Sequence, residues 1–392
     1  MTKKPVKYVN KKLKFMGIDL GILGRKNKTP VYIYSKKRIG EKLEILKEAF
    51  TKTLGIHYSV KANSNRQVLK FLKAQKIGVD VVSGGEVTRA LECGFKGRDI
   101  IFSGVGKSEE EITATLKIGI YLFNVESPQE LDRIARVARR LKKCACVSFR
   151  LNPNVDAKTH PYITTGFREN KFGMDKKFIP ELLKILKRNP KNLKLIGLDF
   201  HIGSQLTEIN PYEAAFKKSV PVYQELQRQG FALSHFDIGG GIGISYERQK
   251  TIDLKKFGKM VESYLKPLGC KILCEPGRFL VGDAGVLLAQ VEYVKKTPYK
   301  TFVILNTGMH HLIRPALYNS YHEILPVNQK GGKTINLDVV GPICESSDWL
   351  AKNRKLVIPS QGDLWAICDV GAYGYVMASD YNLHKKPIEI LI

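Results

Sequence analysis

The sequence predicts an α/β protein in which a (β/α)8 TIM-like barrel is followed by a mostly antiparallel β domain. Between about residue 55 and residue 280, a short apolar run, a polar or glycine-rich end and a helical stretch recur eight times. An open doubly wound sheet is the alternative, and the strand count favours the barrel. After about residue 285, strand-like runs follow one another with few helical stretches between them, which indicates a separate β domain.

The eight runs in chain order are HYSVKAN, VDVVSGGE, IIFSGVGK, YLFNVES, CVSFRLNP, LIGLDFHIGS, HFDIGGGIG and KILCEPGR. Amphipathic stretches such as SNRQVLKFLKAQ, SPQELDRIARVARRLKK and KKFIPELLKILKRN separate them, and the second of these begins with Ser127 as helix N-cap and Pro128 in the first turn. The runs end on polar, glycine or ionisable residues, where barrels place their chemistry: Lys61, Asp80, Ser103, Glu126, Arg150, His201, Gly239–Gly241, and Glu275 with Arg278.

The β domain is predicted from five runs, VLLAQVEYVKKT, YKTFVILNTG, TINLDVVGP, KLVIPS and DLWAICDVG. The N-terminal KLKFMGIDLGILG precedes the first barrel unit and is expected to add a strand to this domain. The predicted domains are therefore a barrel over residues 34–285 and a β domain over 286–392, with residues 1–33 joined to the latter.

Composition is that of a globular protein without a membrane span or secretory signal, so we expect a cytoplasmic enzyme or binding protein. The net charge of +27 raises the possibility of a nucleic-acid partner. The lysines are scattered through every expected helix, which disfavours a dedicated nucleic-acid surface. The seven cysteines have no regular spacing, so neither a disulfide framework nor a metal site is expected.

Three rim features carry candidate chemistry. Lys61 at a strand tip could act as a Schiff-base nucleophile, although most lysines only face solvent. In the run Gly239–Gly241, consecutive backbone N–H groups could point toward phosphate oxygens, or the run could be a plain tight turn. It does not match the GxGxxG fingerprint of dinucleotide-binding proteins. Glu275 and Arg278 could bind a cofactor ring nitrogen and a substrate carboxylate, or form a structural ion pair.

The ordered set of motifs resembles the pyridoxal-phosphate-dependent fold-type III decarboxylases, which have an alanine-racemase-like fold. The motifs are YSVKAN, VDVVSGGE, FRLNPN, DFHIGSQ, DIGGGIG, CEPGR, GPICESSDWLAK and GAYGYVMASDYN, and the likeness runs from about residue 10 to the C-terminus. The stretches THPYITTGFRENKFG (159–173) and LIRPALYNSYHEI (312–324) favour the diaminopimelate branch of the family over the ornithine branch.

The resemblance implies pyridoxal 5'-phosphate as cofactor. Lys61 would carry it as a Schiff base, His201 would stack on its ring, and Glu275 would bond its pyridinium nitrogen. Asp80 and Arg150 would support the lysine and the surroundings of the ring. The phosphate would be bound by Ser204, Gly239, Gly240, Gly241 and Tyr373.

The same resemblance implies a homodimer with shared active sites, because Cys344 and Glu345 would enter from the β domain of the other subunit. A thiol is a competent acid near neutral pH, so Cys344 is the candidate proton donor to the carbanion left by decarboxylation. Meso-2,6-diaminopimelate keeps a second amino-carboxylate, which Arg278 and Arg314 could clamp with help from Tyr318, Glu345 and Tyr373. The expected products are L-lysine and CO2, in the last step of lysine biosynthesis.

Three departures from the family pattern are Asn306 in NTGM, Asp380, and LHKKP in place of SRPRP. They bear on specificity more than on the reaction class. Two alternatives stay open: a decarboxylase of the same fold that acts on carboxynorspermidine, ornithine, arginine or lysine, and a catalytically dead regulatory relative.

Overall fold

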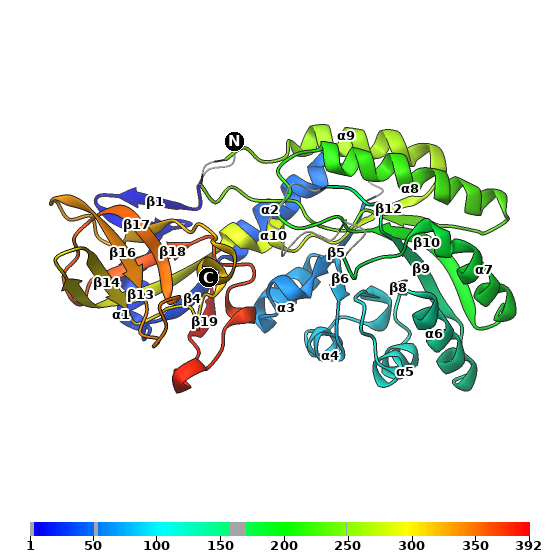
Figure 1. The fold of residues 1–392 in the computed structure, drawn as a ribbon, viewed down its shortest axis with the longest axis horizontal. Coiled ribbons are helices and arrows are strands. Elements are labelled where there is room, and N and C mark those ends of the chain that lie inside the picture. Colours follow the sequence, from blue (N-terminus) through cyan, green and yellow to red (C-terminus); the bar gives the residue numbers. More distant parts are fainter. Residues whose placement is uncertain (1–3, 51–53, 157–165, 167–169, 248) are drawn as a thin grey trace. The chain divides into compact units, whose positions relative to one another are not determined.

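The structure, a computed structural model, describes residues 4–50, 54–156, 166, 170–247 and 249–392. Contacts divide the chain into two compact units (Figure 1). The barrel unit comprises Leu43–Gly243 and Lys250–Phe279, and the β unit comprises Met1–Lys42, Ile244–Gln249 and Leu280–Ile392. The predicted domain ranges 34–285, 286–392 and 1–33 stay predictions. The units differ from them chiefly in assigning residues 34–42, 244–249 and 280–285 to the β unit.

The barrel unit contains a closed barrel of eight parallel strands that follow chain order, with the last strand paired to the first. All eight predicted runs supply a strand, so the predicted barrel is confirmed. The strands are β5 (Leu54–Ser59), β6 (Gly78–Val81), β7 (Ile100–Phe102), β8 (Leu122–Val125), β9 (Ala145–Leu151), β10 (Leu193–Phe200), β11 (His235–Asp237) and β12 (Lys271–Cys274).

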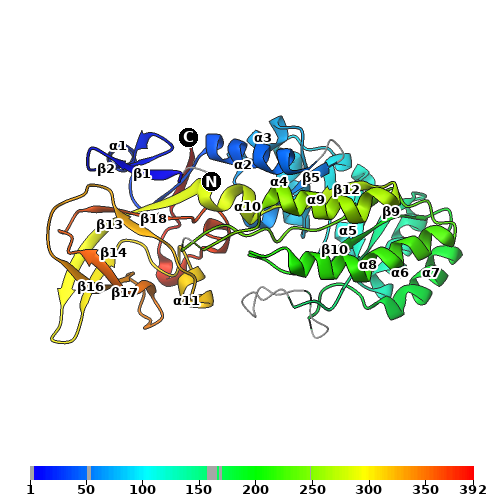
Figure 2. The same ribbon diagram turned by 90° about the horizontal axis from the view of Figure 1, so that it is seen from above.

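The first helix precedes β5 and the later helices follow barrel strands. The helices lie outside the barrel (Figure 1), while Figure 2 shows α8 and α9 running side by side along it. The helices are α2 (Lys36–Ala49), α3 (Arg66–Ala74), α4 (Gly84–Glu92), α5 (Glu109–Ile118), α6 (Pro128–Arg140), α7 (Ile179–Arg188), α8 (Asn210–Arg228) and α9 (Leu254–Leu265).

Capping side chains fix where several of these helices begin. The Ser127 hydroxyl accepts the backbone N–H of Glu130 at 3.1 Å, and Pro128 occupies the first turn of α6 as predicted. At α5, Ser108 and Glu111 form a reciprocal capping box. Local sequence therefore sets where α5 and α6 begin.

The β unit contains a mixed sheet in which most neighbours are antiparallel, as predicted. Two pairs are parallel, β14 with β16 and β4 with β19. The strands are β4 (Val31–Tyr34), β13 (Gly285–Lys296), β14 (Thr301–Leu305), β15 (Ile324–Pro326), β16 (Thr334–Val340), β17 (Trp349–Val357), β18 (Leu364–Cys368) and β19 (Ile388–Leu391). The short helices α10 (Arg278–Val281) and α11 (Arg314–Tyr318) complete the elements near the candidate residues.

The stretch KLKFMGIDLGILG lies in the β unit. It forms β2 (Lys12–Phe15) and β3 (Ile18–Asp19) of a separate three-stranded sheet with β1 (Val6–Val9), followed by α1 (Leu20–Lys26). The N-terminal strand that joins the large sheet is β4, which pairs with β13. The strand expected at KLVIPS is the end of β17, which begins at Trp349.

The small N-terminal sheet belongs to the same core as the large sheet. Leu13 and Phe15 are fully buried and pack in one cluster with Val286 and Leu288 of β13. Burial of such side chains contributes about 1.5–3 kcal/mol each. No helix within the described residues has the length and apolarity needed to cross a membrane.

Candidate active site

Lys61 lies on the rim of the barrel, two residues beyond the end of its strand. It occupies the centre of a 3-10 turn, Val60–Ala62, that directly follows β5. Its Nζ donates to Asp80 Oδ2 at 2.7 Å. Asp80 is fully buried, and the side chain of Lys61 is 34% exposed. The pairing of Ser59 with Asp80 across β5 and β6 brings this carboxylate to the end of the lysine's strand.

His201 follows β10 and is bonded to the glycine run. The backbone N–H of Gly240 donates to His201 Nδ1 at 3.1 Å, so Nδ1 is an acceptor and the ring proton belongs on Nε2. Burial lowers the pKa of His201 well below its usual value, and the charges of Arg150 and Lys61 lower it further. His201 is therefore a neutral imidazole held by backbone.

The glycine run leaves no room for side chains. Gly239 and Gly241 have φ of +63° and +100°, and a Cβ at Gly240 would lie 2.2 Å from the carbonyl oxygen of Glu275. The Gly239 N–H donates to Asp237 Oδ1 at 2.9 Å. Two of the three expected phosphate-binding N–H groups, those of Gly239 and Gly240, therefore have acceptors within the protein.

Ser204 and Arg278 lie together at the same rim. The guanidinium of Arg278 donates to Ser204 Oγ from Nε at 3.3 Å and from Nη2 at 3.0 Å. A Cβ at Gly241 would lie 2.5 Å from the carbonyl oxygen of Gly203, so the glycine run packs directly on the segment that carries Ser204. The structure therefore gathers a hydroxyl, a guanidinium and a glycine turn in one place.

Glu275 follows β12 and is buried, with 5% exposure. Its Oε1 lies 3.1 Å from Asn124 Nδ2 and 3.3 Å from Ser103 Oγ. Burial raises the pKa of Glu275 well above its usual value, and the neighbouring carboxylates Asp237, Asp80 and Asp199 raise it further. A carboxyl group held this way can interact with the ring nitrogen of a cofactor.

Arg150 is buried beneath the rim rather than aimed at solvent. Its Nη1 lies 2.7 Å from Glu126 Oε1, and its Nε lies 3.7 Å from Asp199 Oδ2. Burial alone would lower the pKa of Arg150, but Glu126, Asp199 and Glu275 hold it above the usual value. Arg150 therefore provides a permanent positive charge among the carboxylates of the barrel.

The remaining candidate residues belong to the β unit. Arg314 begins α11, is 4% exposed, and bonds His322 Nε2 at 2.9 Å while its guanidinium lies 4.8 Å from the centre of the Tyr246 ring. Tyr318 ends the same short helix and is half-buried. Tyr373 is half-buried and has a positive φ of 56°.

Cys344 and Glu345 lie on an exposed loop between β16 and β17. The Glu345 carboxylate accepts from Tyr381 Oη at 2.6 Å and from Ser347 Oγ at 2.8 Å, and these bonds lower its pKa. The buried Asp348 fixes the loop, because its two oxygens accept the backbone N–H groups of Met309 at 2.6 Å and Ile343 at 2.7 Å.

Asp199, Asp237 and Asp348 were missed from the sequence. Asp199 lies two residues before His201, and Asp237 lies two residues before Gly239. Alternation along a strand sends residues two apart to the same face, so this spacing could have indicated inward carboxylates. No comparable pattern marks Asp348, whose role depends on the loop geometry.

The branch-specific stretch and the departures Asn306 and Asp380 lie in different parts of the chain. Residues 159–165 and 167–169 of the branch-specific stretch THPYITTGFRENKFG lie outside the described residues. Asn306 bridges two segments, since its Nδ2 donates to Thr29 Oγ1 at 3.0 Å and its Oδ1 accepts the Gln290 N–H at 2.9 Å. An ionised carboxylate can only accept, whereas this amide both donates and accepts, which accounts for asparagine rather than aspartate at this position. Asp380 is exposed.

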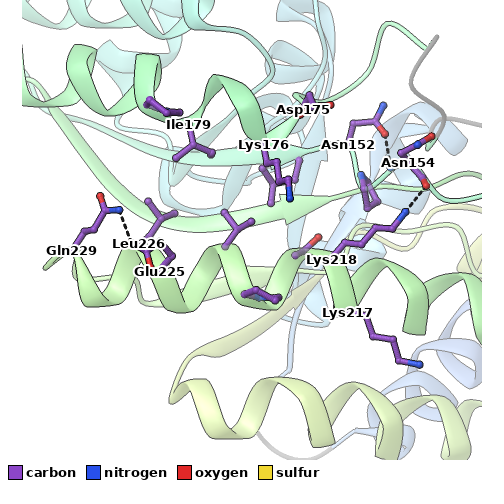
Figure 3. Close-up of a pocket in the computed structure, with 16 residues that line it drawn as sticks. Asn152, Asn154, Asp175, Lys176, Ile179, Lys217, Lys218, Glu225, Leu226 and Gln229 are labelled. Atoms are coloured by element: carbon purple, nitrogen blue, oxygen red, sulfur yellow. Dashed lines mark hydrogen bonds between the residues drawn. The ribbon is translucent and has the colours of Figure 1, made fainter.

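A groove elsewhere on the barrel unit is lined by none of the candidate residues (Figure 3). It has a volume of about 730 Å³ and lies between α7 and α8, beside the segment that follows β9. Pro180 and Leu226 line it together with Lys176, Lys217 and Glu225. Its lining does not include Lys61, Asp80 or Glu275 of the rim.

Comparison with known proteins identifies the class. Residues 36–282 match the family described as "Pyridoxal-dependent decarboxylase, pyridoxal binding domain". This range covers every barrel strand and the rim residues from Lys61 to Arg278. Fold and match together define a pyridoxal-dependent decarboxylase of fold type III.

Closer relatives narrow the class. The diaminopimelate decarboxylase of Aquifex aeolicus is 41% identical over 390 residues, which cover 99% of this chain and 92% of the relative. The diaminopimelate decarboxylase of Neisseria meningitidis serogroup A is 44% identical over 365 residues, which cover 93% of this chain and 89% of the relative. A crystal structure of the Helicobacter pylori diaminopimelate decarboxylase complexed with L-lysine superposes with a TM-score of 0.92 at 43% identity, covering 95% and 94% of the two chains. The chain belongs to the diaminopimelate decarboxylase family.

Proposed function

We propose that the chain removes CO2 from meso-2,6-diaminopimelate to give L-lysine, with pyridoxal 5'-phosphate as cofactor. The observation that carries the proposal is the contact of Lys61 Nζ with the buried Asp80, on the barrel rim that also carries Glu275 and the glycine turn. The relatives named diaminopimelate decarboxylase supply the substrate. The reaction is the last step of lysine biosynthesis.

The rim residues fit the cofactor by their chemistry. Lys61 offers an amine for covalent attachment, and Asp80 orients it. Glu275 offers a buried carboxylate for the ring nitrogen, and His201 a flat neutral face for the ring. When bound, pyridoxal phosphate supplies an electron sink for the carbanion left by decarboxylation. The protein supplies the orientation of the groups and the charge at the ring nitrogen.

For the phosphate we propose the N–H of Gly241, the hydroxyl of Ser204 and the phenol of Tyr373. The N–H groups of Gly239 and Gly240 donate to Asp237 and His201. These two glycines therefore contribute the close approach of the backbone, which leaves no room for side chains, rather than hydrogen bonds to the phosphate. Arg278 donates to Ser204 and so places its positive charge at the phosphate end. Its proposed second role is to bind a carboxylate of the substrate.

The proton donor and the distal clamp come from the β unit in this proposal. Cys344 protonates the carbanion, while Arg314 and Tyr318 bind the distal carboxylate and Glu345 pairs with the distal ammonium. The exposure of Cys344 and Glu345 in a single chain fits residues that a second copy covers. We therefore propose a homodimer in the cytoplasm in which each copy supplies this loop to the active site of the other.

A substrate panel tests the proposal. Purified protein loaded with pyridoxal phosphate is given meso-diaminopimelate, carboxynorspermidine, ornithine, arginine or lysine, and released CO2 is measured. We expect release from meso-diaminopimelate at least 100-fold faster than from the others. Faster release from another substrate would establish the same-fold alternative, and no release with any substrate would favour the dead regulatory relative.

Hybrid dimers test the shared sites. Lys61→Ala and Cys344→Ala variants should each be nearly inactive alone. Mixed after brief dissociation, they should recover up to about a quarter of wild-type activity, because half the dimers are hybrids with one intact site of two. No recovery from a mixture shown to exchange subunits would contradict the exchange of the Cys344 loop.

Any nucleic-acid binding through the +27 charge should disappear with added salt and show no sequence preference.

A further inference from the structure

A pocket of about 760 Å³ lies toward the end of the barrel where the strands begin, away from the rim that carries the proposed site. Gly78, the first residue of β6, lines it, whereas Asp80 further along β6 contacts Lys61. Small-molecule sites have volumes of about 300–1,000 Å³. The pocket has an apolar wall, formed by Phe50, Leu54, Ile56 and Ile77, and four cationic side chains, those of Lys47, Lys73, Lys76 and Arg98.

Two of the four cations are not neutralised by a neighbour. Lys47 Nζ lies 2.9 Å from Glu44 Oε1, and Lys73 Nζ lies 2.6 Å from Asp99 Oδ2. Within residues 4–50, 54–156, 166, 170–247 and 249–392, Lys76 and Arg98 form no ion-pair contact, and both are exposed. The dipole of α3 accounts for a cation just after its end, at Lys76. It does not account for Arg98, which lies in a 3-10 turn before β7.

His57 lines the same pocket with an unused polar atom. The residue is 9% exposed, and its Nδ1 is buried without a hydrogen-bond partner in the part of the chain that the structure describes. The opposite edge of the ring packs on β6, since a Cβ at Gly78 would lie 2.6 Å from Nε2. Burial lowers the pKa of His57 to about 4, so the ring is neutral at pH 7. A buried polar atom without a partner is costly, so Nδ1 needs a partner from outside the chain.

These features match one kind of ligand. A phosphate monoester carries nearly two negative charges at neutral pH, which two unpaired cations balance. A guanidinium binds phosphate oxygens in pairs, and an ammonium binds them as a point charge. The apolar wall suits an organic group attached to the phosphate. We propose that the pocket binds a small organic phosphate, with Lys76 and Arg98 at its phosphate and a hydrogen bond from the ligand's polar atoms to His57 Nδ1.

Calorimetry with adenosine monophosphate tests the binding. The protein is first loaded with pyridoxal phosphate, so that the proposed cofactor site is filled. We expect saturable binding of one nucleotide per chain with a dissociation constant below about 1 mM. Adenosine, which lacks the phosphate, and inorganic phosphate, which lacks the organic group, should each bind at least tenfold more weakly. Absence of saturable binding, or equal binding of adenosine, would overturn the proposal.

Paired variants locate the site. The double variant Lys76→Gln with Arg98→Gln should raise the dissociation constant at least tenfold, in protein with wild-type circular dichroism. The matched control, Lys184→Gln with Arg188→Gln, removes two exposed cations of α7 that do not line the pocket, and it should change the constant less than twofold. Equal effects of the two double variants would show that only net charge matters, which would overturn the proposal.

Histidine side-chain NMR tests the contact with His57. Its signal is identified by its absence from the spectrum of His57→Phe. Adenosine monophosphate should shift this signal in the wild type but not in the double variant Lys76→Gln with Arg98→Gln. A shift confined to other histidines would overturn the placement. Tighter binding of a short single-stranded DNA, in competition with the nucleotide, would assign the pocket to nucleic acid and overturn the proposed ligand class. Neither assay depends on decarboxylation, so both are independent of the proposed substrate.

Discussion

Replacing Gly240 with alanine should misplace Glu275 while leaving the barrel folded. The added Cβ would lie 2.2 Å from the carbonyl oxygen of Glu275. These atoms must separate by at least 0.8 Å to reach the 3.0 Å below which real Cβ contacts essentially do not occur. The obstacle is backbone rather than a flexible side chain, so the ends of β11 and β12 must move apart. Glu275 N–H bonds Gly239 O at 2.8 Å, so both strand ends are affected.

The magnitude follows from this displacement. Overpacking of a close-packed interior typically costs about 1–3 kcal/mol, which lowers Tm by roughly 2–4 °C per kcal/mol for a domain of this size. A misplacement of about 1 Å at reacting groups can reduce the rate about 100-fold. We therefore expect a modest loss of stability and a large loss of kcat for Gly240→Ala.

Thermal unfolding and steady-state decarboxylation measure the two effects. Gly106→Ala is the matched control, because a Cβ at Gly106 meets nothing within 4 Å and its φ is not positive. The control should retain wild-type Tm and activity within twofold. If Gly240→Ala kept kcat within threefold of the wild type, the proposed dependence of Glu275 on the glycine turn would be refuted.

Three further predictions concern stability and the β unit. Glu130→Gln should destabilise the protein by about 3 kcal/mol in urea unfolding, because Lys107 Nζ, which contacts Glu130 at 2.6 Å, would lose its buried carboxylate partner. The control is Glu109→Gln, which removes an exposed carboxylate and should unfold like the wild type. Equal urea midpoints for the two variants would contradict the prediction. Burial lowers the pKa of His57 to about 4, so the stability contributed by its neutral form is complete above pH 6.5 and is lost as the pH falls toward 4. Between these two pH values, His57→Phe should reduce the slope of the unfolding free energy against pH by about 1.4 kcal/mol per pH unit. An unchanged slope would refute this prediction. Asp348→Asn should lower kcat and reduce the free energy of unfolding by about 1–3 kcal/mol, because the NH2 group of the new side chain would face the N–H of Met309 or Ile343. Wild-type kinetics would show that Asp348 does not position the Cys344 loop.

The barrel was predictable because its strands repeat one physical pattern. Each apolar run ends on a polar or glycine residue, and parallel strands bring those ends to one rim. Lys61, Asp80, His201, Glu275 and Arg278 were found in this way, and the structure places them on that rim. The roles assigned to them stay predictions.

The β unit was less predictable because its pairings join distant parts of the chain. The strand VYIY is fully buried and shows no alternation, so nothing in its sequence separates a barrel strand from β4 of the large sheet. The stretch KLKFMGIDLGILG contains strand-like residues, but its sheet partner depends on tertiary packing. The C-terminal β19 pairs with β4 across more than 350 residues, and local sequence carries no signal of such a contact.

The buried carboxylates show a second limit of sequence reasoning. A period of two can place Asp199 and Asp237 on the inner face of the barrel, but protonation depends on distances and partners. How these carboxylates ionise depends on their proximity, their burial and the position of Arg150.

The most direct test of the account is the site of covalent cofactor attachment. Protein loaded with pyridoxal phosphate is reduced with borohydride and digested, and the peptides are analysed by mass spectrometry. We expect a phosphopyridoxyl group on Lys61 at close to one per chain, and none on the other lysines. A label spread over exposed lysines, or a specific label on a lysine other than Lys61, would contradict it.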